Sequence, residues 1–565
     1  MPSPSPSPSP ATQVAGPSAA RWAWCAPALI AIALYLPSLR NGFAYDDEII
    51  VANNARIHHW GTLLSALRLP YWYDGGHLYR PLTTLSFAVE WIVGGGSPLP
   101  FHLVNVLWHA AVVALVARLA LQWWSPGAAF AAGLWFAIHP VHVEAVANVV
   151  GRSELMCAAA LLALAIVTVR AAPPVAAPTP AGEPLASVPI TGDTGQLFLI
   201  AALSAAAMAT KETGIAAPVI AWAGGWLART RTHSITDDMH GRRAAWRCAG
   251  AAAVGVLLVV AIRFAVLGGA AGDDPHPAFN AVSAPRAILL ALASLPRAVG
   301  LVLAPQLPRI DYSPTDADLA HLDPSLIVCG VALIAGAIGA FVLHIRRPGP
   351  WTFAMVFAAV TLAPVSNLVI HTGVVIAERT LYSPSIAAAL AMGVATAALW
   401  QRRARVSLAL AGAVAGAAIL FTEISIPMWR DTPSAFAAIR ARSPDSYRGY
   451  SLVASRETTA GHTAAARADY EAAIDRFSHD PVVLYQAGAN ALRSGDTAVA
   501  IRRLSASVAV DSTLLRARTA LVMLCLRGGD TTRARALLVD GLRIAPGQRA
   551  WRATLDRLPP TGARP

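Results

Sequence analysis

Charged residues are scarce in this sequence. Asp, Glu, Lys and Arg make up 13% of the 565 residues, whereas a soluble globular domain carries about 25%. The hydrophobic share is 55% and the mean hydropathy is +0.51. A soluble chain of this size needs a charged surface, so the shortage excludes an ordinary soluble protein. The composition predicts a membrane protein whose surface faces lipid.

Cysteine is also scarce, and its positions exclude two kinds of site. The chain has five cysteines with no CxxC or metal-like spacing, and four of them lie in or beside apolar runs. A disulfide framework or a structural zinc site is therefore not expected. We interpret these cysteines as small core residues; they are Cys25, Cys157, Cys248, Cys329 and Cys525.

Acidic residues are fewer than basic ones, which gives a formal net charge of +12. A basic chain can bind nucleic acid, but here the arginines gather at the ends of apolar runs. That is the orientation pattern of a bilayer protein. We predict contact with membrane lipids and no nucleic-acid partner.

Long apolar runs are abundant. A spanning helix needs roughly 20 apolar residues, and we predict an all-α, polytopic protein with about eleven spans. The predicted spans lie near 22–39, 102–121, 127–146, 154–170, 195–210, 213–228, 246–266, 325–344, 351–370, 382–400 and 406–424. Together with the loops they form one predicted membrane domain, 21–424.

Two apolar stretches need separate interpretation. The run Trp22 to Leu39 follows a Ser/Pro-rich tail (1–20) that we expect to be disordered. It lacks an adjoining basic region and an A-x-A site, so we expect an anchored span rather than a cleaved signal. The stretch 285–305 is interrupted by prolines and arginines, which favours an interfacial or re-entrant segment over a full span.

Basic residues predict the orientation. With a cytoplasmic N-terminus, nearly every dense arginine cluster falls on the inner side. The predicted outer loops are 40–101, 139–153, the region around Lys211–Thr213, 267–324 and 371–381. The inner loop 171–194 is a Pro/Ala-rich linker, and the C-terminal region is expected outside.

After Glu423 the composition becomes that of soluble helices. Glycines, small residues and apolar residues recur with a period of 34. That period is typical of tetratricopeptide repeats, and we predict an α-solenoid of about three units over 440–550; an unrelated helical bundle is the alternative. The repeating positions are Gly461, Gly495 and Gly529; Ala466, Ala500 and Ala534; and Tyr470, Leu504 and Leu538.

The first predicted outer loop, 41–101, holds an acidic cluster just beyond the first span. Asp46, Asp47 and Glu48 could form a solvated loop or a helix N-terminus, or they could face a cavity. The rest of the loop is aromatic and basic, and a short interfacial helix is expected from Pro81. Acid, aromatic surface and cation together would suit a sugar carried on a lipid phosphate.

Seven segments in order resemble the transmembrane and tetratricopeptide-repeat O-mannosyltransferases, a family that modifies cadherin-like domains in animals and has bacterial look-alikes. They are FAYDDEIIVANNARI, YRPLTTLSFAVEW, FHLVNVLWHA, HPVHVEAVANVVGRSEL, ATKETGI, the middle-domain-like stretch 263–324 around Asp311-Tyr312-Ser313, and AERTLYSPS. The resemblance covers most of the chain from Asn41 to the repeats.

This resemblance implies a membrane glycosyltransferase of the GT-C fold. It would move a sugar, mannose by the resemblance, from a polyprenyl-phosphate donor to a Ser or Thr hydroxyl outside the membrane. An acid of the first outer loop would act as the base, here Asp46 or Asp47, with Asp46 preferred. A lipid phosphate leaves as a stable anion, so one carboxylate is enough. No metal and no cofactor besides the lipid-linked donor is expected.

Cations must meet the charge that develops on the phosphate. Our candidates are Arg80, Arg152, Lys211 and Arg379. Each has a structural alternative. Arg80 and Arg379 could be interface anchors, and Lys211 could neutralise Glu212.

Two further structural readings concern neighbouring segments. Arg152 could form a buried ion-pair network with Glu154 and Glu144. In HPVH, His139 and His142 could form a metal pair, but the sequence offers no third ligand. Hydrogen bonding to neighbouring spans is the favoured interpretation.

Two rival functions remain open. A transporter for a lipid-linked sugar would want charges within spans and paired broken helices, and a scaffold would only recruit partners through its repeats. The sequence shows no N-x-S/T sequon and no ER retrieval signal, which favours a bacterial plasma membrane over the ER.

Overall fold

The computed structural model describes residues 17–72, 78–170, 194–231, 235–268 and 275–559. Over these ranges the chain is helical and contains no strand. The predicted Ser/Pro-rich tail and the linker 171–194 fall almost wholly outside them, as do Tyr73 and His77 of the aromatic loop.

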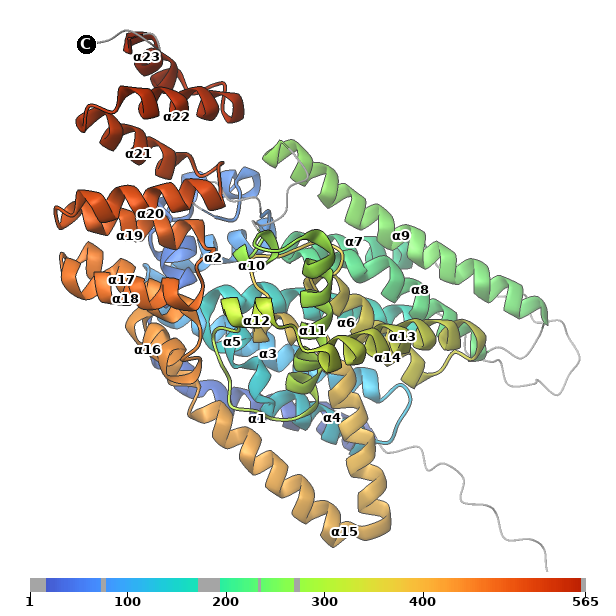
Figure 1. Cartoon of the computed structure of the whole chain (residues 1–565). Coiled ribbons are helices and arrows are strands. Elements are labelled where there is room, and N and C mark those ends of the chain that lie inside the picture. The colour runs from blue at the N-terminus through green and yellow to red at the C-terminus, as the bar shows by residue number, and fades with distance from the viewer. Residues whose placement is uncertain (1–16, 73–77, 171–193, 232–234, 269–274, 560–565) are drawn as a thin grey trace, which may run out of the picture.

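The membrane domain is built from fifteen helices and short connecting turns (Figure 1). They are α1 (Pro17–Tyr35), α2 (Pro81–Gly94), α3 (Pro98–Ala120), α4 (Pro126–Ile138), α5 (Val143–Ala147), α6 (Arg152–Val169), α7 (Thr194–Thr210), α8 (Ala217–Ala228), α9 (Ile235–Leu267), α10 (Pro277–Asn280), α11 (Ala284–Leu303), α12 (Asp316–Ala320), α13 (Pro324–Arg346), α14 (Pro350–Leu362) and α15 (Ser385–Glu423).

Among the described residues, seven helices are long and apolar enough to cross a membrane. They include all or most of α1, α3, α6, α9, α11, α13 and α15. An eighth is counted when α4 and the following segment Pro140–Ala147, bent by 53°, form one broken span. This confirms a polytopic, all-helical membrane protein, with fewer full-length spans than the eleven predicted.

The difference has a local cause in each case. α7 and α14 are apolar but shorter than a full span, and α8 has only 12 residues. α15 covers two predicted spans, 382–400 and 406–424, which are joined at a break where the backbone of Arg403 leaves the helical region (φ −150°, ψ 72°). Figure 1 shows the sharp turn in α15. Contrary to the expectation of an interfacial or re-entrant segment, α11 runs through most of 285–305 as one continuous helix with Pro296 inside it, and it is one of the seven candidate spans.

Small residues let the central helices approach closely. α1, α3, α4, α6 and α15 share the main hydrophobic core. Where α15 crosses α4, a Cβ on Gly393 would lie 2.5 Å from the backbone nitrogen of Ala132, so only glycine fits. Such crossings are typical of packing inside a membrane, where van der Waals contact replaces the hydrophobic effect.

The first loop folds onto this bundle as short turns followed by α2. Its turns are Leu36–Arg40, Glu48–Ala52, Ala55–Ile57, Trp60–Thr62 and Ser65–Arg68. The predicted interfacial helix begins at Pro81, as expected, because proline suits the first helical turn. A small core beneath the loop joins Ile50, Val51 and Phe87 to Val149 and Val150, in the turn just before α6.

Helices of the C-terminal region follow α15 directly. They are α16 (Thr432–Arg442), α17 (Tyr447–Thr459), α18 (Thr463–Arg476), α19 (Pro481–Arg493), α20 (Thr497–Val510), α21 (Leu515–Arg527), α22 (Thr531–Ile544) and α23 (Arg549–Arg557).

From α17 to α22 these helices pack as three successive pairs. Gly461, Gly495 and Gly529 occupy the turn within each pair at φ values of 87°, 80° and 77°, a left-handed conformation that favours glycine. The period of 34 therefore marks a repeated helix–turn–helix, and its assignment to tetratricopeptide repeats remains a prediction.

Candidate active site

The side chains of Asp46 and Asp47, in the first loop, lie in different surroundings. Asp47 is fully buried, and its carboxylate accepts hydrogen bonds from the backbone N–H groups of Ala44 (3.1 Å), Val149 (3.3 Å) and Val150 (2.9 Å). Burial raises the pKa of Asp47 to about 7, although the three N–H donors oppose the shift. Asp47 thus ties the loop to the start of α6.

Asp46 lies beside Arg379 instead. Arg379 belongs to the turn Glu378–Leu381, and its Nη1 atom is 3.3 Å from Oδ2 of Asp46. The side chain of Asp46 keeps 15% of its surface exposed. A carboxylate that is both accessible and paired with a cation can receive a proton from a substrate.

Arg379 is shared between two acids. Its Nε atom is 3.5 Å from Oε1 of Glu144, and its backbone N–H donates to the other oxygen of Glu144 at 2.9 Å. Burial opposes the charge on Arg379, but Glu144 and Asp46 outweigh it and raise the pKa of Arg379 above its ordinary value. The guanidinium therefore stays charged between the two carboxylates.

Arg80 and Glu212 form a second pair nearby. Arg80 donates from both Nε and Nη2 to Glu212, with a shortest distance of 2.7 Å, and stacks over the ring of Tyr71 at 4.8 Å. Arg263 of α9 lies 3.8 Å from the same carboxylate. Burial raises the pKa of Glu212, but Arg80 outweighs it, so this pKa lies below its ordinary value.

Lys211 pairs with Glu154 of α6, and both side chains are buried. Lys211 and Glu212, adjacent in sequence, therefore take partners from different elements rather than neutralising each other. Glu154 also raises the pKa of Arg80 and of Arg379, after the stronger contributions of burial and of their direct partners. The pairs thus share one electrostatic environment.

We call this group the charged cluster; it comprises Asp46, Arg80, Glu144, Glu154, Lys211, Glu212, Arg263 and Arg379. Its members come from the loops that the sequence predicted on one side of the membrane, joined by α6 and α9. An incoming phosphate would compete with the carboxylates for these cations. Among the described residues no group of three His, Cys, Asp or Glu side chains is arranged to hold a metal ion.

Arg152 bonds to residues outside the charged cluster. It is fully buried and donates to Asn105 Oδ1 (2.7 Å), to the carbonyl of Phe101 (2.7 Å) and to Glu90 of α2. All its donor nitrogens are thereby engaged in holding α2, α3 and α6 together. The geometry favours the structural alternative for Arg152, although the predicted partners Glu144 and Glu154 pair elsewhere.

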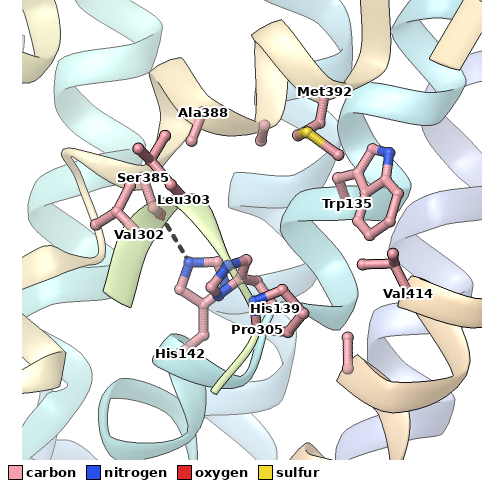
Figure 2. Close-up of a pocket in the computed structure, with 12 residues that line it drawn as sticks. Trp135, His139, His142, Val302, Leu303, Pro305, Ser385, Ala388, Met392 and Val414 are labelled. Atoms are coloured by element: carbon pink, nitrogen blue, oxygen red, sulfur yellow. Dashed lines mark hydrogen bonds between the residues drawn. The ribbon is translucent and has the colours of Figure 1, made fainter. Parts of the chain in front are cut away.

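His139 and His142 line a small apolar cavity of about 40 Å³ between α4, α11 and α15 (Figure 2). His142 bonds to the carbonyl of Phe136 and to Ser385 Oγ, both at 2.8 Å. His139 Nδ1 accepts the backbone N–H of Val141 at 3.3 Å. The bond from His142 to Ser385 of α15 fits the favoured interpretation, hydrogen bonding to a neighbouring span, whereas the bond of His139 stays within its own turn.

Some residues of the site were not predicted as such. Arg263 carried a usable signal, because a cation within the apolar run of α9 is costly unless it is paired. Glu144 was predicted beside Arg152 but serves Arg379 instead. That difference depends on a contact between residues 235 positions apart.

The fold and the site together define a polytopic, all-helical membrane protein with a charged cluster where several loops meet. No family model matches the chain. The chain is similar to protein O-mannosyl-transferase TMTC2 of Mus musculus, 41% identical over 140 residues, which are 22% of this chain and 16% of that protein. It is likewise similar to protein O-mannosyl-transferase Tmtc1 of Drosophila melanogaster, 42% identical over 144 residues, with 24% and 16% covered.

A longer match extends the resemblance. Protein O-mannosyl-transferase TMTC3 of Mus musculus is 27% identical over 396 residues, which cover 63% of this chain and 40% of that protein. The chain thus spans less than half the length of each of these relatives. The resemblance inferred from the ordered motifs is confirmed.

Among solved structures, an archaeal oligosaccharyltransferase, AglB from Archaeoglobus fulgidus, solved with an inhibitory peptide and a dolichol-phosphate, matches at a TM-score of 0.37 and 13% identity. The match covers 72% of this chain and 55% of that one.

Proposed function

We propose that this protein is a membrane glycosyltransferase. It transfers a sugar, mannose by analogy with the named relatives, from a polyprenyl-phosphate donor to a Ser or Thr hydroxyl of an extracytoplasmic protein. The observation that carries the proposal is the accessible carboxylate of Asp46 beside Arg379, within the segment whose motif resembles that of the relatives. A GT-C fold is part of the same proposal.

The chemistry needs one base and several cations. Asp46 takes the proton of the acceptor hydroxyl while its oxygen attacks the anomeric carbon. The bond from that carbon to the phosphate oxygen breaks, and polyprenyl phosphate leaves with the electron pair. A positioned base contributes about 10²–10⁴-fold to such a reaction.

Arg379, Arg80 and Lys211 are proposed to stabilise the leaving phosphate. Arg379 is the strongest candidate because its side chain is 25% exposed and already faces Asp46. The side chain of Arg80 is 14% exposed and that of Lys211 only 7%. Lys211 is therefore proposed to contribute its charge at longer range, without direct contact with the phosphate. Fixed cations are effective here because they need no reorganisation as the charge develops.

The test is transfer of radiolabelled mannose from polyprenyl-phosphate mannose to an extracytoplasmic protein extract by the purified full chain in lipid nanodiscs. We expect Asp46→Asn to reduce turnover by about 10²-fold or more with unchanged thermal stability. Asp475→Asn, at an exposed aspartate of α18, is the matched control and should transfer normally. Robust transfer by Asp46→Asn would overturn the base assignment, and absence of any donor consumption would favour a scaffold.

We further propose that the charged cluster and the C-terminal helices face the extracytoplasmic side of a bacterial plasma membrane. Two arginine-rich segments, after α8 and at the end of α13, lie close to each other. Arg229 stacks on Trp226, and the indole N–H of Trp226 donates to the carbonyl of Ile345, next to Arg346. This common location supports placing them together on the opposite, cytoplasmic side. In a variant lacking the native cysteines, Ala498→Cys should react with an impermeant maleimide on intact cells. Gln401→Cys should react only after permeabilisation, and the reverse pattern would invert the site.

A further inference from the structure

The residue before Asp46 has an unusual backbone. Tyr45 has a φ of 57°, and within the described chain only Tyr45 and Asn367 are non-glycine residues with positive φ. A bulky side chain rarely adopts this left-handed conformation, so surrounding contacts must hold it in place. The conformation of Tyr45 sets the direction in which the next residue, Asp46, leaves the chain.

The contacts that hold Tyr45 come from α16 at the start of the C-terminal region. The backbone N–H of Tyr45 donates to Thr432 Oγ1 at 2.9 Å, and the Thr432 hydroxyl in turn donates to the carboxylate of Glu48. The ring of Phe436 meets the ring of Tyr45 edge to face at 5.7 Å. Thr432 thus binds the acidic loop on both sides of Asp46 and Asp47.

Arg448 of α17 holds the other end of the same side chain. Its Nη2 atom donates to the Tyr45 hydroxyl at 2.9 Å, and its Nη1 atom lies 3.8 Å from Asp311. Asp311 is fixed in turn by the hydroxyls of Ser446 (2.5 Å) and Ser313 (3.0 Å). The Asp311-Tyr312-Ser313 segment therefore orients Arg448, and Arg448 orients Tyr45.

We propose that Thr432 and Arg448 are positioning residues for Asp46, which makes the first two C-terminal helices a working part of the active site. The inference rests on the proposed function for its activity readout. Neither residue needs to touch the donor or the acceptor. Their loss lets the loop leave the strained conformation and moves the Asp46 carboxylate away from the acceptor hydroxyl.

A positioning role predicts a particular kinetic pattern. Arg448→Met should lower kcat about tenfold with the KM for donor changed less than twofold, because misplacing a base affects the chemical step more than donor binding. Tyr45→Phe removes only the hydroxyl that Arg448 holds, so it should cause the same loss. The double variant should be no worse than Arg448→Met alone, since Arg448→Met already removes the bond to the Tyr45 hydroxyl.

Conservative variants and a control separate positioning from general damage. Thr432→Val should lose activity about as much as Arg448→Met, whereas Thr432→Ser keeps the hydroxyl and should recover most of it. Arg430→Met is the matched control, because the Arg430 side chain is exposed and pairs with Asp431 and Ser434. Losses that multiply in the double variant, or single variants with unchanged kcat, would overturn the proposal.

A second measurement does not depend on turnover. Amide hydrogen exchange of residues 41–57 in nanodiscs should become faster in Thr432→Val and Arg448→Met but not in Arg430→Met. Unchanged exchange in both variants would contradict the inference even if the enzyme is active. If the wild type transfers no sugar but the exchange rises as expected, the proposed function fails while the link between the C-terminal helices and the loop stands.

Discussion

The first loop, with Asp46 and Asp47, and the turn Glu378–Leu381 meet through two sets of side chains. The two sets differ in the kind of group that they bind. On one face, Asp46 and Arg379 pair with each other through side chains that keep 15% and 25% of their surface exposed. On the other face, their neighbours in sequence, Asp47 and Glu378, are buried and accept hydrogen bonds. We call these the reactive face and the anchoring face.

The anchoring face is built from groups that do not exchange partners easily. Asp47 is held by three backbone N–H groups, and Glu378 accepts from the N–H of Arg309 (2.8 Å) and from the hydroxyl of Tyr312 (2.5 Å). The reactive face relies on ion pairs, which a phosphate or a substrate hydroxyl can compete for. In each of the two segments, one residue thus contributes to stability and its neighbour in sequence is available for chemistry.

Replacing the cation of the reactive face should have the largest effect. Arg379→Met leaves Asp46 and Glu144 without the guanidinium that lies between them, and it removes the proposed phosphate contact. We expect kcat/KM to fall by about 10²–10³-fold in the mannose-transfer assay.

Arg379→Lys separates charge from geometry. A lysine keeps the charge but cannot bridge two acids in the same way, so it should recover activity only in part. Arg297→Met is the control, since Arg297 is exposed and stacks on Tyr312. Full activity in Arg379→Met would remove Arg379 from the proposed donor site.

The matching change on the anchoring face should affect stability instead. Asp47→Asn turns one acceptor oxygen into an NH₂ group that faces backbone N–H donors, which leaves buried donors unpaired. We expect a loss of about 2–3 kcal/mol in unfolding free energy, measured by SDS titration in mixed micelles. Turnover per folded molecule should stay within about fivefold of wild type if Asp47 only anchors.

If Asp47→Asn instead abolished turnover without loss of stability, the roles of Asp46 and Asp47 would have to be exchanged. Asp46→Asn provides the comparison in the same titration, and it should leave the unfolding free energy nearly unchanged.

The sequence was sufficient to find the acidic residues and the candidate cations. It was not sufficient to decide which of them anchor the fold and which are available for chemistry. The acidic pair, its place after the first span and the candidate cations all follow from residue type and topology. The choice between Asp46 and Asp47 depends on the backbone of Val149 and Val150, which lies 102 and 103 residues further on. No local pattern encodes such a contact.

The same reasoning applies to the cations. Arg80 and Arg379 meet in one cluster as predicted from the loops, whereas Arg152 looked equivalent in sequence and is enclosed by Asn105, Phe101 and Glu90. The part played by Arg448 had no signal in the sequence, because it lies in an ordinary soluble helix.

A smaller effect is expected from the pH dependence of the anchoring face. Burial raises the pKa of Glu378 from 4.5 to about 8. The folded state therefore holds a proton that the unfolded chain releases, and this contribution to stability is complete below about pH 4.5 and is lost as the pH rises through 8.

Glu378→Gln tests this sign directly. Its amide oxygen can still accept from Arg309 and Tyr312, and it cannot ionise, so the fall in stability between pH 5 and 8.5 should shrink. We expect a difference of at least about 1–2 kcal/mol across that window, measured by thermal unfolding at each pH. A variant with the same pH slope as wild type would show that Glu378 does not titrate there.

The smallest effect should come from the histidine cavity, which contains no such pairing of acid and cation. His139→Asn keeps an acceptor for the N–H of Val141 at a position that starts a helical turn, where asparagine is favoured. We expect a stability change below about 0.5 kcal/mol and unchanged transfer. A loss of more than about tenfold in transfer, together with loss of bound metal in elemental analysis, would establish the metal pair instead and would move part of the chemistry away from the charged cluster. Unchanged transfer would leave Asp46 and Arg379 as the place where the reaction depends on single side chains.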